Sequence, residues 1–301
     1  MISDDSGGIE LTYGGQSMSG PLRRVMVRRP AAPESESQWK AFNYVHPVDH
    51  AMSLVEHRAL CDLLVGEGVD VIEATGDEPG DLDAIFTYDP SLITDQGVIL
   101  LNMGKKQRIG EPSLHARMYA DFGIPILGEI TGAGTIEGGD TLWLDESTLA
   151  VGVGYRTNSD GVAQLRSILK PVGVTVLNYD LPHWTGLADC LHLMSFISPI
   201  APHAALVHKP LMAVELLREL DRREWNLIGL PSHEFLSMGC NVLSLAPYRV
   251  VVVNGNPCTR TVLEGAGCTV TEYPGDHISH NRAGGPTCLT RPILRDREAS
   301  D

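Results

Sequence analysis

The sequence predicts an α/β fold made of five repeats, each with a strand, a helix and a second strand. Five times along the chain, an amphipathic helical stretch ends at or near a glycine and runs directly into a short β-branched segment. A further strand-like run precedes each of these helices. Apolar residues at helical spacing followed by a short β-branched run are typical of a helix that packs on a sheet. Five units, whose marker residues lie 42 to 55 positions apart, account for most of the 301 residues and favour one ring over two lobes.

The junction between helix and strand is the clearest part of the repeat. Its five copies read, in order, LLVGEGVDVIEA, YADFGIPILGE, LKPVGVTVLNYD, DRREWNLIGLP and LEGAGCTVTEYP. The residues before the five strands are Gly68, Gly123, Gly173, Trp225 and Gly267. Because glycine adopts the left-handed conformation that ends many helices, we expect such a cap at the four glycines.

The remaining elements of each unit follow in order. The strands before the helices are predicted in RRVMVRRP, GVILLN, STLAVGVG, AALVH and YRVVVVNG. The first helix is predicted to start near Asp49, with a core-facing stripe of Ala51, Val55, Ala59, Leu63 and Leu64. A third segment follows the second strand, which makes each unit strand-helix-strand-strand. The third segments are DAIFTYDPSL, EGGDTLWLD, ADCLHLMSFIS, MGCNVLSLA and GGPTCLTRPI.

Each third segment carries one polar or nucleophilic side chain among apolar neighbours. These side chains are Asp89, Glu137, His192, Asn241 and Cys288. If the five units close in a ring about one axis, the third segments line its centre and the five side chains converge. We therefore expect one central site that contains a nucleophile, a proton carrier and two carboxylates.

Composition restricts the partners. The chain has 38 acidic and 23 basic residues, a formal net charge of -15, and so lacks the basic stripe that nucleic-acid binders need. The aliphatic runs are far shorter than the roughly 20 residues of a membrane helix, and the acidic first segment does not resemble a secretory signal. We expect a soluble cytoplasmic protein with a small cationic partner and no nucleic acid or membrane; a homo-oligomer is left open.

We predict one catalytic domain over residues 20–293, a disordered N-terminal tail over 1–19 and a C-terminal tail over 294–301. The long, Pro-containing segment between Arg29 and Val48 is the candidate lid. The six cysteines have no Cys-x-x-Cys spacing, which indicates neither a zinc site nor a disulfide framework.

Five motifs in one order carry a family resemblance. They are FTYDP (residues 86–90), EGGD (137–140), GYRTN (154–158), CLHLMSF (190–196) and GGPTCLT (284–290). The chain resembles the guanidine-modifying, or pentein, superfamily, which includes dimethylarginine dimethylaminohydrolases, arginine deiminases and amidinotransferases. The resemblance runs from about Arg23 to Pro292 and implies a five-bladed α/β propeller. It also implies a reaction that needs no metal and no cofactor.

These motifs do not decide to which subfamily the chain belongs. The chain length and Met194 in CLHLMSF look more like the dimethylarginine enzymes, whereas FTYDP looks like the deiminase motif. Tyr88 is interpreted as altering the wall next to Asp89, which argues against a methylated substrate. An amidinotransferase, an arginine dihydrolase and a non-catalytic propeller that serves as a binding module are the alternatives.

The resemblance implies a hydrolase that cleaves C–N bonds of linear amidines through a covalent thiouronium intermediate. Cys288 would attack the guanidinium carbon, and His192 would act first as acid and then as base. Glu137 would orient His192, contact the guanidinium, or do both. The structural alternatives are a buried thiol for Cys288, a hydrogen-bonded core histidine for His192 and a solvated turn carboxylate for Glu137.

Four further residues are expected to bind substrate. Asp89 would pair with the guanidinium. Asp83 matches a second family acid, with a solvated loop carboxylate as the alternative. Arg156 and Arg108 match arginines that hold the substrate carboxylate; as alternatives, Arg156 would be a surface charge and Arg108 part of a loop cluster with two lysines. Asn241 is expected to be a structural hydrogen-bonding residue first.

Overall fold

The computed structural model describes residues 12–74, 80–186 and 191–297, which form five three-stranded sheets and five α-helices. The helices are α1 (His50–Gly66), α2 (Glu111–Asp121), α3 (Ser159–Leu169), α4 (Val214–Arg222) and α5 (Pro257–Gly265). The strands of each sheet are given in spatial order. The first sheet has β15 (Arg291–Arg295), β1 (Leu22–Arg28) and β2 (Asp70–Ala74), and the second has β3 (Ser91–Thr94), β4 (Gly97–Leu100) and β5 (Ile126–Glu129). The third has β6 (Thr141–Asp145), β7 (Thr148–Val153) and β8 (Thr175–Asp180), the fourth has β9 (Ile197–Ala201), β10 (Ala204–Val207) and β11 (Asn226–Gly229), and the fifth has β12 (Leu243–Ala246), β13 (Arg249–Val253) and β14 (Thr269–Tyr273).

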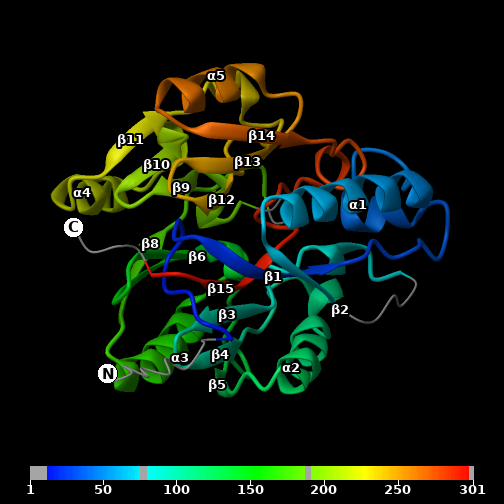
Figure 1. Cartoon of the computed structure of the whole chain (residues 1–301). Coiled ribbons are helices and arrows are strands. Elements are labelled where there is room, and N and C mark those ends of the chain that lie inside the picture. The colour runs from blue at the N-terminus through cyan, green and yellow to red at the C-terminus, as the bar shows by residue number, and fades with distance from the viewer. Residues whose placement is uncertain (1–11, 75–79, 187–190, 298–301) are drawn as a thin grey trace, which may run out of the picture.

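All five sheets have the same topology. The middle strand pairs in parallel with the strand that follows its helix and antiparallel with the strand on its other side. Figure 1 shows the five helices at the periphery, outside the strands. The repeated α/β unit predicted from the sequence is therefore present five times.

The third segment of each unit lies in the next sheet, a detail that the sequence pattern does not contain. The five segments run into β3, β6, β9, β12 and β15, and each pairs with the middle strand of the following sheet. The last of them, β15, pairs with β1, so one sheet contains strands from both ends of the described chain. Every unit is thus joined to the next by backbone hydrogen bonds.

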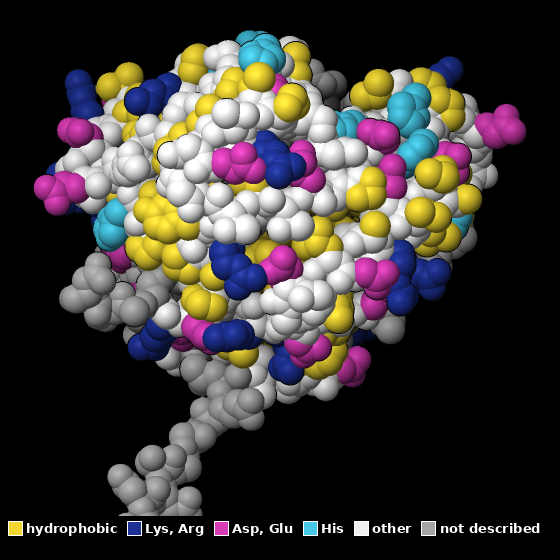
Figure 2. Space-filling model, turned by 45° about the horizontal axis from the view of Figure 1, so that its top comes forward, with side chains coloured by type: hydrophobic (Ala, Val, Ile, Leu, Met, Phe, Trp, Pro, Cys, Tyr) yellow, Lys and Arg dark blue, Asp and Glu magenta, His cyan; other side chains and the backbone are white. Residues whose placement is uncertain are grey.

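The core follows from the burial of these strands. Val250, Val251, Val252 and Val253 of β13 are all buried, because one face meets helix α5 and the other meets neighbouring strands. Helix α4 buries Leu216 and Leu220, four residues apart and so on one helical face. The charges lie outside this core, and Figure 2 shows acidic and basic side chains interspersed over one face of the surface.

Four of the five junctions have the predicted left-handed glycine. The φ angles are 85° at Gly68, 66° at Gly123, 80° at Gly173 and 92° at Gly267. In the remaining unit the left-handed residue is Glu224, with a φ of 57°, one residue before the marker Trp225. Trp225 itself is buried in the core.

Part of the predicted N-terminal tail is ordered. Gly14 donates its N–H to the Ile293 carbonyl and accepts from the N–H of Arg295, both at 2.9 Å. Strand β15 ends at Arg295, two residues past the predicted domain boundary. Residues 1–11 and 298–301 of the two predicted tails lie outside the described residues. None of the helices in the described part has the length and hydrophobicity required to cross a membrane.

The left-handed Glu224 gives a prediction about stability. Glu224→Gly should raise the free energy of unfolding by about 0.5–1 kcal/mol, because a side chain in this conformation costs more than the backbone freedom of glycine. Gly173→Ala should lower it by about 1 kcal/mol for the converse reason, although no atom lies within 4 Å of the new methyl group. Urea unfolding measures both; a loss of stability in Glu224→Gly contradicts the argument.

Candidate active site

A pocket of about 100 Å³ brings together the seven residues singled out from the sequence. Its lining includes Asp83, Asp89, Arg108, Glu137, Arg156, His192 and Cys288. All of them except Cys288 are buried, and Cys288 is partly exposed. The solvated and surface-charge alternatives for Asp83, Glu137 and Arg156 are therefore wrong, and Arg108, for which the alternative was a loop cluster with two lysines, is buried as well.

Short 3-10 turns ahead of the sheets position several of these side chains. Asp83 lies in the turn Leu82–Ile85 before β3, and Glu137 is the N-cap of the turn Gly138–Asp140 before β6. His192 is the N-cap of the equivalent turn before β9. Because the sheets share one topology, these turns deliver their side chains to one place.

His192 and Glu137 are in direct contact within the pocket. His192 Nε2 lies 2.8 Å from Glu137 Oε2. Gly139 permits the close packing of the imidazole, because a Cβ atom there would lie 2.3 Å from His192 Nδ1. Burial alone would raise the pKa of Glu137, but the hydrogen bond and charge of His192, together with two arginines, hold that pKa well below its ordinary value. Glu137 is therefore an ionised carboxylate beside the imidazole.

A second carboxylate, Asp140, fixes the backbone of the His192 turn. Asp140 Oδ1 accepts a hydrogen bond of 2.9 Å from the N–H of Leu193. Burial raises the pKa of Asp140 to about 6. The imidazole is thus located both by its own bond to Glu137 and by its turn.

Asp89 and Arg108 form a buried ion pair beside the imidazole. Arg108 Nη1 donates to Asp89 Oδ2 at 2.5 Å, while Asp89 Oδ1 accepts from the N–H of Gly139 at 2.9 Å. Arg108 also donates twice to Glu111, at 2.8 Å each, and once to the Phe86 carbonyl. Most donors of Arg108 are therefore directed at protein groups.

The other two expected substrate ligands are also paired. Arg156 Nη1 lies 3.2 Å from Glu137 Oε2, and Lys105 donates its backbone N–H to Glu137 Oε1 at 2.9 Å. Asp83 accepts from the Tyr44 hydroxyl at 2.8 Å and from Lys105 Nζ at 2.5 Å. Each pocket carboxylate thus faces a cation of the same chain.

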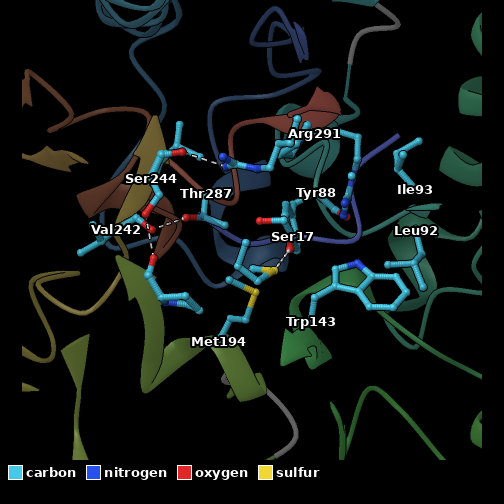
Figure 3. A pocket seen from close by; sticks show the side chains of 16 residues that line it. Ser17, Tyr88, Leu92, Ile93, Trp143, Met194, Val242, Ser244, Thr287 and Arg291 are labelled. Carbon is cyan, nitrogen blue, oxygen red and sulfur yellow. Dashed lines mark hydrogen bonds between the residues drawn. The ribbon is translucent and has the colours of Figure 1, made fainter. Parts of the chain in front are cut away.

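Cys288 is held by Asn241, a contact that sequence reasoning underrated. Asn241 Nδ2 lies 3.1 Å from Cys288 Sγ, and Asn241 Oδ1 accepts from the N–H of Thr287 at 3.0 Å. Because the amide oxygen must face the Thr287 N–H, the NH₂ group must face the sulfur. Thr287 Oγ1 also donates to the Val242 carbonyl at 2.9 Å, which ties the two loops together (Figure 3). The signal in the sequence was that Asn241 occupies the same repeat position as the other four site residues.

Sequence reasoning also missed three pocket residues, and one interpretation was wrong. Phe42 of the candidate lid, Lys105 and Arg282 line the pocket. Tyr88 does not: its ring stacks on Arg291, 3.8 Å away, and lines a separate pocket with Trp143 (Figure 3). The backbone directs neighbouring side chains to opposite sides here, so Tyr88 does not form the pocket wall next to Asp89 and gives no argument against a methylated substrate.

Within the described part of the chain, two groups of side chains have the spacing of a metal site. The atoms of Asp89, Glu137 and His192 lie within 4.8 Å of one another, but Arg108 and Arg156 already neutralise the two carboxylates, so a cation would meet two positive charges. The second group is His233, Glu234 and Cys258. Glu234 accepts hydrogen bonds from the backbone N–H groups of Cys258 and Thr259 at the start of α5. The N-terminal end of a helix carries a partial positive charge and repels cations.

Comparison with known proteins gives a consistent family. The family model described as arginine deiminase matches residues 83–224 and 203–295. A dimethylarginine dimethylaminohydrolase of Pseudomonas aeruginosa is 27% identical over 271 residues, 89% of this chain and 98% of the relative. An arginine deiminase of Limosilactobacillus reuteri is 26% identical over 253 residues, and the match covers 71% of this chain and only 62% of that relative. The structure of an amidinotransferase from Microseira wollei has the same fold, with a TM-score of 0.78 and 17% identity over 96% of this chain and 99% of that one.

The contact between Asn241 and Cys288 predicts thiol reactivity. A hydrogen bond to an ionised group is worth about 1.5–3 kcal/mol, so Asn241→Ala should move the alkylation of Cys288 by iodoacetamide to higher pH by about one unit or more. Peptide mass spectrometry at each pH follows Cys288 separately from the other thiols. The exposed Asn226→Ala variant serves as control; equal pH profiles in all three proteins would show that the amide does not influence the sulfur.

The lowered pKa of Glu137 predicts a pH-dependent stability. A carboxyl group whose pKa is lower in the folded chain stabilises the fold above its unfolded pKa and loses that contribution as the pH falls. Glu137→Gln should therefore be less stable at neutral pH by at least about 1 kcal/mol. This difference should shrink as the pH falls below the ordinary value of 4.5. Urea unfolding across this range measures it, with exposed Glu146→Gln as control; a constant difference contradicts the assignment.

Proposed function

Because the chain belongs to the arginine deiminase family, we propose that it is a cysteine-dependent hydrolase of guanidino compounds. Arginine and N-methylated arginine are the substrates that the named relatives suggest, with citrulline and either ammonia or an amine as products. The observation that carries the proposal is that Cys288, His192, Glu137 and Asp89 line one pocket.

Binding of the guanidinium is assigned to the carboxylates. Asp89 and Glu137 present buried oxygens that match the planar N–H groups of a guanidinium. At the other end of the substrate, Asp83 and the two arginines are the proposed ligands. Arg156 is the stronger candidate for the carboxylate, since Arg108 already donates to Glu111, Asp89 and a backbone carbonyl.

The reaction proceeds in two steps. The Cys288 thiolate attacks the guanidinium carbon, a C–S bond forms, and the C–N bond breaks as His192 transfers a proton to the departing amine. His192 then removes a proton from water, the resulting hydroxide attacks the same carbon, and the C–S bond breaks to return the thiolate and release the ureido product. Glu137 favours the protonated imidazole that the first step requires and the second step regenerates, because its negative charge lies 2.8 Å from Nε2.

The finer architecture belongs to the same proposal. We propose that residues 20–293 form one catalytic domain in which the five sheets close as a five-bladed propeller, with the pairing of β1 and β15 as the closing contact. No metal or cofactor is needed in this mechanism, and the protein is proposed to act in the cytoplasm.

Product formation tests the proposal. Purified protein incubated with arginine, with N-methylated arginines and with arginine analogues should release a ureido product, detected by colorimetry and mass spectrometry. Cys288→Ser should lose turnover by at least about 1,000-fold, since the nucleophile is removed. Absence of a ureido product from every guanidine would overturn the hydrolase assignment. Transfer of the amidino group to an added amine would instead indicate an amidinotransferase.

Covalent labelling separates an enzyme from a non-catalytic binding module. A haloacetamidine probe carries the cation that the carboxylates recognise and an electrophile for the thiol. Labelling should be lost in Cys288→Ser and retained in Cys258→Ser, which removes an exposed cysteine instead. Cys240 is unsuitable as the control because burial raises its pKa to about 12. Equal labelling of the two variants favours the binding module.

A further inference from the structure

Asp83 and Lys105 form an ion pair in the pocket, and the two proposed reaction steps do not use Lys105. Lys105 Nζ lies 2.5 Å from Asp83 Oδ2, and the Tyr44 hydroxyl occupies Asp83 Oδ1 at 2.8 Å. Asp83 and Lys105 both line the pocket, and their side chains are only 6% and 14% exposed. Both oxygens of this carboxylate are thus engaged by groups of the chain itself.

The surroundings of the Lys105 ammonium are those of an ammonium-binding site. Besides Asp83, Nζ lies 3.5 Å from the Phe42 carbonyl oxygen and 5.2 Å from the centre of the Phe42 ring. A carboxylate, a carbonyl and an aromatic face are the groups that bind a primary ammonium ion. Lys105 therefore fills the position in which the α-ammonium of a free amino acid would meet Asp83.

The charges of the pocket lead to the same conclusion. Among the described lining residues, the carboxylates Asp83, Asp89 and Glu137 face Lys105, Arg108 and Arg156 respectively. A fourth cation, Arg282, donates hydrogen bonds to three neutral acceptors: the His277 and Leu82 carbonyls and the Ser53 hydroxyl. A substrate with one guanidinium and one carboxylate adds no net charge to the pocket. Arginine also carries an α-ammonium, and this extra cation would meet Asp83, which is already paired with Lys105.

We propose that Lys105 makes the enzyme prefer guanidino carboxylates without a free α-ammonium over free arginine. The substrate class is an ω-guanidino acid or an Nα-acylated arginine, which share a guanidinium, a carboxylate and no ammonium. Lys105 and Arg156 are then the cations proposed to face the carboxylate of the substrate. This proposal rests on the proposed hydrolase function and restricts its substrate.

Rates on matched substrates test the preference. Arginine, 5-guanidinopentanoate, Nα-acetylarginine and agmatine differ only at the tail and can be compared by kcat/KM for ureido product. In the unchanged protein, 5-guanidinopentanoate or Nα-acetylarginine should exceed arginine by about tenfold or more, since an unmatched buried charge costs at least this much. Agmatine, with an ammonium and no carboxylate, should be the poorest. Arginine equal to or better than both analogues would overturn the proposal.

Two variants assign the preference to Lys105. Lys105→Met releases Asp83 and should reduce the ratio of 5-guanidinopentanoate to arginine by about tenfold or more, mainly through KM. Lys105→Gln keeps a hydrogen-bond donor without the charge and should give an intermediate ratio. The exposed neighbour Lys106→Met is the matched control and should keep the ratio of the unchanged protein. An unchanged ratio in both Lys105 variants would overturn the role of this residue.

Binding distinguishes failure of this proposal from failure of the hydrolase function. Calorimetric titration of Cys288→Ser with arginine and with 5-guanidinopentanoate measures tail recognition without turnover. Tighter binding of 5-guanidinopentanoate supports the tail preference even if no guanidine is hydrolysed. Tighter binding of arginine refutes the preference and leaves the hydrolase function intact.

Discussion

The buried carboxylate of Glu137 is the constraint on which the pocket depends. It accepts hydrogen bonds from the imidazole of His192, the guanidinium of Arg156 and the backbone of Lys105. These partners come from three separate segments of the chain. A fully buried charge is tolerated only when it is paired and hydrogen-bonded, so the sheets that carry these segments must stand at fixed distances from one another.

The repeated sheet provides this precision. Each sheet takes its antiparallel strand from the preceding unit, and the turn ahead of that strand faces the pocket in several units. The side chains on the turns are therefore fixed by backbone ladders on both sides rather than by mobile loops. The paired charges lie on and near these turns, while the aliphatic strands behind them form the core.

The seven pocket residues were predicted from motifs that resemble those of guanidine-modifying enzymes, and four of them also from their place in the repeat. The repeat and the four glycine caps could be predicted from the sequence, because glycine placement and alternating apolar runs depend on local geometry. The exchange of strands between units could not, since a short β-branched run fits any neighbouring sheet. Tyr88 was misplaced because its direction depends on how the turn before β3 bends, which the letters FTYDP do not specify. Lys105 and Asn241 were underrated because their partners lie 22 and 47 residues away.

The pairing of β15 with β1 has a consequence for the order of events during synthesis. Cys288 lies three residues before β15, the strand that completes the first sheet. A nascent chain can therefore fold four sheets while Cys288, the proposed nucleophile, is still inside the ribosome. A chain truncated before β15 would leave β1 without its antiparallel partner, and the segment that carries Cys288 would lose its anchor on that side.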